Sequence, residues 1–365
     1  MNNSLAERIL VQIMGWDQEQ ISVERPLIQA LGSLKFDEYQ QFSTGMRFTE
    51  SLVNWLNQFA TVEERNIAYN FIKNQLIFIT SEQINHLINI CFPEKIDIRL
   101  TVKAAEIMQV PEYLVKKIYE SETYKEVKRK ALFLGLSDGA KIDQLRRSAN
   151  LDNEQVFSSY HISDEKIYDF IKELKEALKH ESKFSSIFLI DDFTASGLSY
   201  LRVKEGKGKL LNFLKMVFEP KKAEETVLSD LIGLDSLDVH VVFYLATRKA
   251  LNYLEDGIET WKKENNKTFN HSVSAVQVIE EATSDFVKAE TDFINIIKRQ
   301  EYFDENIIDK HYKKGRIEQP YFGFDECALP VVLNHNTPNN SIPILWFPPD
   351  MKIIGLFPRV TRHKE

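Results

Sequence analysis

The sequence is poor in the features that mark secreted, membrane-spanning or disordered chains. Its 365 residues include only two cysteines, 13 glycines and 11 prolines. Cys91 and Cys327 lie far apart and match no metal-ligand spacing, so we expect neither a disulfide framework nor a metal site. No window approaches the roughly 18 apolar residues of a membrane-spanning helix, and the N-terminus has neither the basic stretch nor the cleavage site of a signal peptide. These absences predict a cytoplasmic protein without membrane contact.

The chain also lacks an excess of positive charge. It carries 46 lysines and arginines against 54 aspartates and glutamates, which gives a net charge of −8. Such a balance repels nucleic acid, so any nucleic-acid contact must be local or made through a partner. The hydrophobic content of 43% is that of an ordinary globular protein. The length exceeds the ~100–200 residues of one domain, so we expect either two folding units or one large decorated unit.

The first third of the chain has the apolar spacing of helices. Apolar residues recur at helical spacing from Phe48 to Phe59, and Thr61 with Glu64 forms a capping box for the next helix. A further helical stretch runs from about Val102 to Lys130, interrupted near Pro111. These patterns predict an all-helical N-terminal region over residues 1–125.

From Ala131 onward, short apolar runs alternate with turn residues and helical patterns. This alternation is typical of an α/β fold with a mainly parallel sheet, which we assign to residues 126–365. A helix with an apolar face near Phe170 would cross between the first two strands. The predicted strands are 131–134, 185–190, 239–245, 273–279 and 328–333, with a further apolar run at 342–347, and helices are expected at 248–256 and 284–299.

One segment carries a pattern that indicates chemistry. Asp191 and Asp192 follow the apolar run 187–190, at the strand end where ligands bind open α/β sheets. The small residues 194–197 come next, and we expect a helix to begin at Leu198. Unpaired amides at such a helix N-terminus bind phosphate. Two carboxylates beside a phosphate site need a ligand with hydroxyls or a cation, and ribose 5-phosphate provides the hydroxyls and the phosphate.

The segment IFLIDDFTASGLS, residues 187–199, resembles the signature of the type I phosphoribosyltransferases: four apolar residues, two acids, a spacer and a small Thr-Gly-like turn. The resemblance implies that Asp191 and Asp192 bind the ribose hydroxyls. It also implies a phosphate site formed by Thr194, Ala195, Ser196, Gly197 and Ser199. Leu198 departs from the signature, which has Gly, Lys or Thr at that position.

The family has a second loop, after its first core strand, that holds pyrophosphate. The segment 135–139 stands in that place, so the resemblance implies pyrophosphate contacts for Ser137, Asp138 and Gly139 and a Mg²⁺ ion held through the ligand's pyrophosphate. The C-terminal segment FGFDECALPVVLNHNTPNNSIPILWFP is similar to phosphoribosyltransferase-like effectors of bacterial anti-phage systems, including those linked to retrons. That likeness implies a reverse transcriptase with its nucleic acid, or a small winged-helix regulator, as partner.

Each of these segments has a plainer interpretation. The acidic pair also fits a strand end with a helix cap, and less well a receiver or haloacid-dehalogenase loop, while 135–139 also fits an ordinary turn. A basic loop at Lys313, Lys314 and Arg316, and the basic stretch 202–210, are either cations for a pyrophosphate or solvated turns. Asn336 and Asn339 either contact the base or ribose or belong to a turn.

Two functions follow from these patterns. In the first, the protein is an enzyme that transfers or cleaves at the ribosyl C1 position, with the acids orienting the sugar. In the second, it is a catalytically inactive module that senses a nucleotide or binds a partner.

Overall fold

The computed structural model describes residues 3–218 and 228–359. Contacts within the chain group the residues into two units, of which one joins 1–84 to 280–365 and the other spans 85–279. The predicted boundary near residue 125 does not coincide with this grouping and stays a prediction.

The unit 85–279 is built on a parallel five-stranded sheet with the strand order β3-β2-β4-β5-β6. Four of its strands lie where apolar runs predicted them. The remaining strand, β3, has two residues, too few to give a periodic signal. The α/β fold with a parallel core is therefore confirmed. The strands are β2 (Ala131–Gly135), β3 (Val156–Phe157), β4 (Ser186–Thr194), β5 (Asp238–Thr247) and β6 (Asn270–Ile279).

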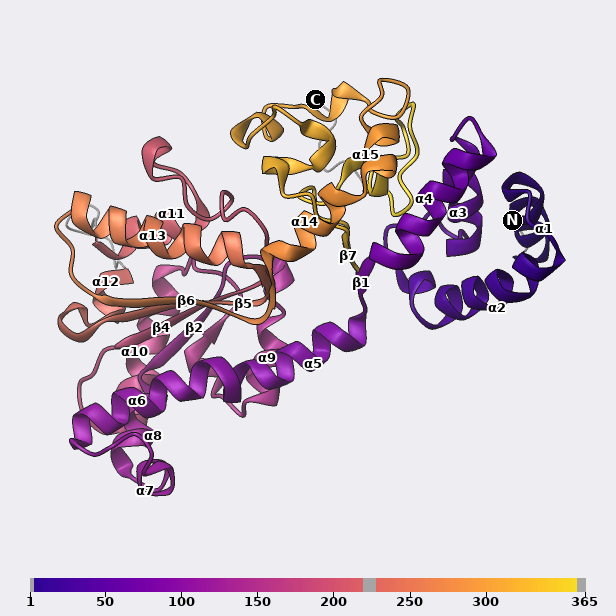
Figure 1. Ribbon diagram of the computed structural model, residues 1–365. Helices are drawn as coiled ribbons and strands as arrows, with labels where there is room; N and C mark the ends of the chain where they lie inside the picture. The colour runs from indigo at the N-terminus through magenta and orange to yellow at the C-terminus, as the bar shows by residue number, and fades with distance from the viewer. Residues whose placement is uncertain (1–2, 219–227, 360–365) are drawn as a thin grey trace. The chain divides into compact units, whose positions relative to one another are not determined.

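Helices cover both faces of this sheet, with α11 and α13 on one side and α6 on the other (Figure 1). The helical stretch up to Lys130 and its interruption near Pro111 are confirmed by α6, α7 and α8. The helices of the unit are α5 (Ser81–Cys91, which begins in the other unit), a π-helical turn (Phe92–Ile96), α6 (Asp97–Met108), α7 (Val115–Tyr119), α8 (Glu122–Arg129), α9 (Ile142–Ser148), α10 (Asp164–Leu178), α11 (Lys209–Phe218), α12 (Leu228–Leu231) and α13 (Arg248–Glu264).

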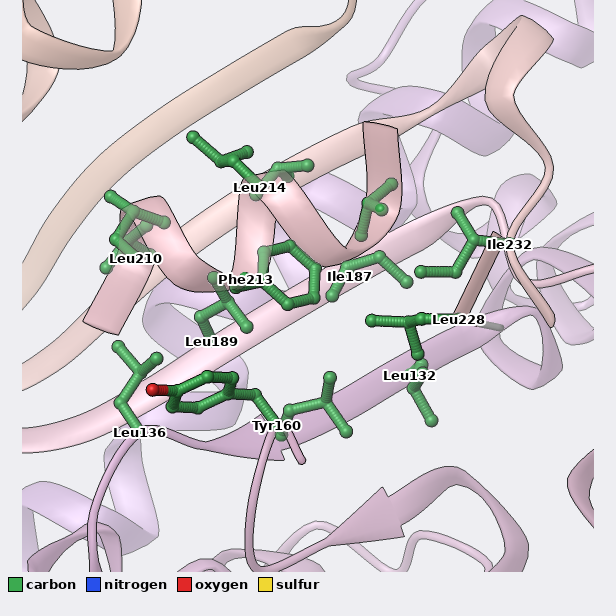
Figure 2. Close-up of a cluster of buried hydrophobic side chains, with 14 of the residues drawn as sticks. Leu132, Leu136, Tyr160, Ile187, Leu189, Leu210, Phe213, Leu214, Leu228 and Ile232 are labelled. Atoms are coloured by element: carbon green, nitrogen blue, oxygen red, sulfur yellow. The ribbon is translucent and has the colours of Figure 1, made fainter. Parts of the chain in front are cut away.

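The main core of this unit lies between one sheet face and helices α10, α11 and α13. Figure 2 shows Phe213 of α11 pointing toward Ile187 and Leu189 of β4. All three side chains are fully buried. Because β4 is covered on both faces, its residues 186–191 are all buried and its apolar run is continuous rather than alternating. This packing fixes the strand whose carboxyl end carries the two acids.

The other unit contains most of the remaining helices and one small sheet. In it, β1 (Ile77–Ile79) pairs in parallel with β7 (Val331–Leu333), so the expectation of an all-helical N-terminal region is wrong at these three residues. Their partner strand lies far along the chain, which a local pattern does not reveal. The helices are α1 (Asn3–Met14), α2 (Gln18–Leu34), α3 (Phe48–Asn57), α4 (Val62–Gln75), α14 (Glu281–Ala289) and α15 (Thr291–Ile297).

In this unit one predicted helix cap is confirmed, and two predicted elements differ from the structure. The Thr61 hydroxyl accepts a hydrogen bond from the Glu64 amide at 3.2 Å and caps α4 as predicted. The helix expected at 284–299 is divided into α14 and α15 near Glu290. The apolar run 342–347 holds a 3₁₀ turn, Pro343–Leu345, because Pro343 has no N–H to donate to a sheet. Within residues 3–218 and 228–359, no helix is long and apolar enough to span a membrane.

Candidate functional site

The two loops singled out by the sequence lie together at the carboxyl ends of β2 and β4. These strands are parallel neighbours, with Gly135 opposite Ile190. The Leu136 amide donates to the Ile190 carbonyl at 2.8 Å, and the Ser137 hydroxyl donates to the Asp191 carboxylate. The structure thus brings both loops to one edge of the sheet. Pyrophosphate binding by Ser137, Asp138 and Gly139 stays a prediction.

Asp191 is buried completely and is held by several donors of the protein itself. Besides Ser137, the Tyr200 hydroxyl donates to Oδ2 at 2.8 Å and the Lys209 ammonium lies 3.1 Å from the same oxygen. The Asp192 amide donates to Oδ1 at 3.0 Å. Burial, followed by the neighbouring Asp192 charge, raises the pKa of Asp191, and Lys209, Ser137 and Tyr200 oppose that rise. Both carboxylate oxygens are therefore occupied within the protein.

Asp192 differs from its neighbour because part of it is exposed. Its Oδ1 accepts a hydrogen bond from the Phe193 amide at 2.8 Å. Its Oδ2 lies so close to Gly139 that a Cβ added there would be 2.6 Å away, which explains why the first loop has glycine at this position. The two acids thus have different environments, and contact of either with ribose hydroxyls stays a prediction.

The turn after β4 is small and firmly held. Residues 194–197 are buried, whereas Ser199 is exposed. The Thr247 hydroxyl donates to the Ala195 carbonyl at 2.6 Å, and the Leu198 amide donates to the Ser196 hydroxyl at 3.4 Å. Gly197 has φ +75°, and a Cβ there would come within 2.7 Å of the Tyr253 ring. The turn is therefore fixed in a conformation that suits glycine.

The expected helix beginning at Leu198 is wrong. The chain turns after Thr194, passes through a 3₁₀ turn at Val203–Glu205, and enters α11 only at Lys209. The amides of Lys209 and Leu210 donate to the carbonyls of Ser199 and Tyr200, at 3.3 and 3.0 Å. The first amides of α11 therefore have protein partners, and α11 does not offer them to a phosphate.

The remaining predicted site residues belong to the other unit. Lys313, Lys314 and Arg316 are exposed, and the Arg316 side chain and amide contact the Asp325 carboxylate at 3.8 and 3.1 Å. Main-chain atoms of two asparagines close turns: the Asn336 amide donates to the Leu333 carbonyl, and the Asn339 carbonyl accepts from the Phe324 amide. Ligand contacts by these residues stay predictions.

The sequence interpretation missed Tyr200 and Lys209 as residues of the acidic site. Lys209 lies within the basic stretch 202–210, where no local pattern distinguishes it from the other lysines. The structure shows the role of Gly208 in this stretch, where φ is +131° and a Cβ would lie 2.2 Å from the Tyr200 carbonyl oxygen. Such a close approach indicates that the chain returns to Tyr200, and so brings Lys209 back to the acids.

A comparison with protein-family models decides the classification. The model of the family PRTase-CE matches residues 52–359, which is more than half of the chain. The chain belongs to the PRTase-CE family. No curated protein and no solved structure matches it. Membership in PRTase-CE supports the resemblance to phosphoribosyltransferases and a phosphoribosyltransferase-like function, and the matched range includes both loops and Lys209.

Proposed function

We propose that the protein binds a ligand containing ribose 5-phosphate and transfers or cleaves at its ribosyl C1 position. The observation that carries this proposal is the contact between the Ser137 loop and the acidic pair at the carboxyl edge of β2 and β4. Ligands of open parallel sheets bind at that edge. The family match supports the phosphoribosyl part of the ligand.

The two acids have different roles in the proposed function. Asp192, which is partly exposed, accepts hydrogen bonds from the ribose hydroxyls and orients the ring. Asp191, whose oxygens have protein partners, is a positioning residue that holds Ser137 and its loop. Ser196, Gly197 and Ser199 receive the 5′-phosphate, and Asp138 and Gly139 lie beside a pyrophosphate or other leaving group.

A Mg²⁺ ion fits this arrangement only if the ligand supplies most of its oxygens. Among residues 3–218 and 228–359, no group of three or more His, Cys, Asp or Glu side chains is placed to hold a metal ion. The partly exposed Asp192 carboxylate offers one protein ligand, or a hydrogen bond to a metal-bound water. When bound, the ion would offset the negative charge that develops on a departing pyrophosphate.

The biological setting is part of the same proposal. We place the protein in the bacterial cytoplasm as an effector of an anti-phage system, held in check by a partner. The partner would be a reverse transcriptase with its nucleic acid or a small winged-helix regulator. The likeness of the C-terminal segment to conflict-system effectors supports this setting.

A second function is a nucleotide sensor without catalysis. The burial of Asp191 and its three side-chain donors favour it, because only one acid of the pair then remains for the ligand. In this case, ligand binding would change the affinity for a partner and leave the nucleotide pool unchanged.

Expression in a bacterial host without partners separates the two functions. For the enzyme, the wild-type protein slows growth and alters the nucleotide pool measured by mass spectrometry, and Asp192→Asn abolishes both effects. Asp235→Asn is the matched control because Asp235 is exposed and precedes β5, away from the carboxyl edge. An unchanged pool in the presence of a verified phage trigger and all partners would exclude catalysis and favour the sensor.

A further inference from the structure

Lys209 is a cation at the acidic site that the signature does not include. Resting on the function proposed above, we infer that the Lys209 ammonium binds the ligand's phosphate, in the role that a helix N-terminus was expected to play. The chain path from Gly197 to α11, the surroundings of the ammonium and the charges of the site support this role.

The chain path leaves the phosphate turn without an adjoining helix N-terminus. In place of a helix at Leu198, residues 199–208 form an excursion that closes on itself. The Arg202 amide donates to the Lys207 carbonyl at 2.9 Å, and the Arg202 guanidinium donates to the Leu198 carbonyl at 2.5 Å. The excursion ends where the Lys209 amide donates to the Ser199 carbonyl at 3.3 Å. Lys209 is therefore joined by its backbone to the exposed end of the predicted phosphate turn.

The side chain of Lys209 connects this turn with the acids. Its ammonium lies 3.1 Å from Oδ2 of Asp191 and 5.0 Å from the centre of the Tyr200 ring. The side chain is 33% exposed, whereas that of Asp191 is 0% exposed. An ammonium group has three N–H donors, and one of them is directed to Asp191. Because the side chain is partly exposed, the ammonium can also donate to an acceptor outside the protein.

The negative charges of the site also favour a cation beside the ligand's phosphate. Asp191 and Asp192 are adjacent, and a phosphate group adds one or two further negative charges nearby. The Lys209 ammonium offsets the charge of Asp191, from which it lies 3.1 Å away. Without Lys209, the ligand's phosphate would meet two carboxylates at short range in a partly buried place, where repulsion is weakly screened.

A simpler role would be that Lys209 only neutralises Asp191. Substitutions in two backgrounds separate the roles, because Asp191→Asn removes the charge that such a role requires. The affinity for ribose 5-phosphate is measured by calorimetry in four proteins: wild type, Lys209→Met, Asp191→Asn, and the double variant. Lys209→Arg tests rescue by another cation, and Lys207→Met, an exposed lysine of the same excursion, is the matched control.

We expect Lys209→Met to weaken binding about tenfold in both backgrounds, as the loss of a charge-assisted hydrogen bond to phosphate does. Lys209→Arg retains most of the affinity, and Lys207→Met retains all of it. Unfolding in urea shows which variants are folded, and the double variant removes both charges of the pair, so it leaves no unpaired buried charge.

Two results overturn the inference in distinguishable ways. If wild type binds ribose 5-phosphate and Lys209→Met causes no further loss in the Asp191→Asn background, Lys209 is a positioning residue only, and the proposed function stands. If wild type itself does not bind ribose 5-phosphate, the proposed function fails together with the phosphate role of Lys209.

Discussion

Asp191 and Asp192 are neighbours in the sequence, but the structure gives them different surroundings. Successive residues at a strand end point to different sides, which directs Asp191 toward Tyr200 and Lys209 and Asp192 toward Gly139. A sequence motif treats the two acids alike. Their different burial leads to separate predictions for the two positions.

The pKa of Asp191 predicts a pH-dependent effect of its substitution. Burial and Asp192 raise this pKa above the ordinary value of 3.8. A raised pKa in the folded state means that protonated Asp191 favours the folded protein more than ionised Asp191 does. This stabilisation is fully present below about pH 3.8 and is lost as the pH rises through the folded-state pKa. Asp191→Asn removes the dependence. The free energy of unfolding of Asp191→Asn relative to wild type should therefore increase with pH from about 4 upward.

Urea unfolding at a series of pH values measures this difference, with Asp235→Asn as the exposed control. A difference that stays constant with pH would show that Asp191 has no raised pKa in the folded protein.

Gly139 gives a test of the contact between the two loops. An alanine Cβ there would lie 2.6 Å from the Asp192 Oδ2, and the carboxylate must move to accommodate it. We expect Gly139→Ala to weaken phosphoribosyl ligand binding about tenfold but to change the free energy of unfolding by less than about 1 kcal/mol, since only a side-chain end moves.

Gly233→Ala is the control for this substitution. A Cβ at residue 233 meets its nearest atom at 3.5 Å, an ordinary contact, and φ is −82°. Equal ligand affinity in Gly139→Ala and Gly233→Ala would mean that the position of Asp192 does not matter for binding.

Among the elements, β2, β4 and β5 were predictable because each is largely a run of buried residues, whereas β6 is only partly buried and was predicted from the apolar run 273–279. The crossover helix α10 was predictable from its apolar face, and its Phe170 is fully buried and in edge contact with the Phe184 ring at 6.3 Å. The path after β4 was not predictable, because the sequence at Leu198 is compatible with a helix start. Hydrogen bonds of the excursion to Leu198, Ser199 and Tyr200, which no local pattern encodes, decide that path.

The packing of α10 on the sheet leads to a stability prediction. Phe170→Ala should lower the free energy of unfolding by about 3–5 kcal/mol, as expected for a large aromatic side chain lost from a core. Tyr168→Ala, on the same helix but 67% exposed, should change it by no more than about 0.5 kcal/mol. Urea unfolding of both variants makes the comparison, and equal losses would place Phe170 outside the core.

At the scale of the whole molecule, the first and last parts of the chain belong to one unit, with the sheet unit between them in sequence. Composition and periodicity describe neighbouring residues, so they did not show that β1 pairs with β7. The PRTase-CE match extends over parts of both units, from residue 52 to 359. The candidate residues of the acidic site all lie in the unit 85–279, whereas those of the basic loop and the asparagine turn lie in the other.

The most direct test of the proposed site is the binding of phosphoribosyl pyrophosphate, with Mg²⁺ present, measured by calorimetry on the 365-residue chain. We predict one site per chain in wild type and in Asp235→Asn. Affinity should be at least about tenfold lower in Asp192→Asn, with a cooperative urea unfolding transition that shows the variant to be folded. Equal affinity in Asp192→Asn and wild type, or no binding by wild type, would contradict a ribose 5-phosphate site between the two loops.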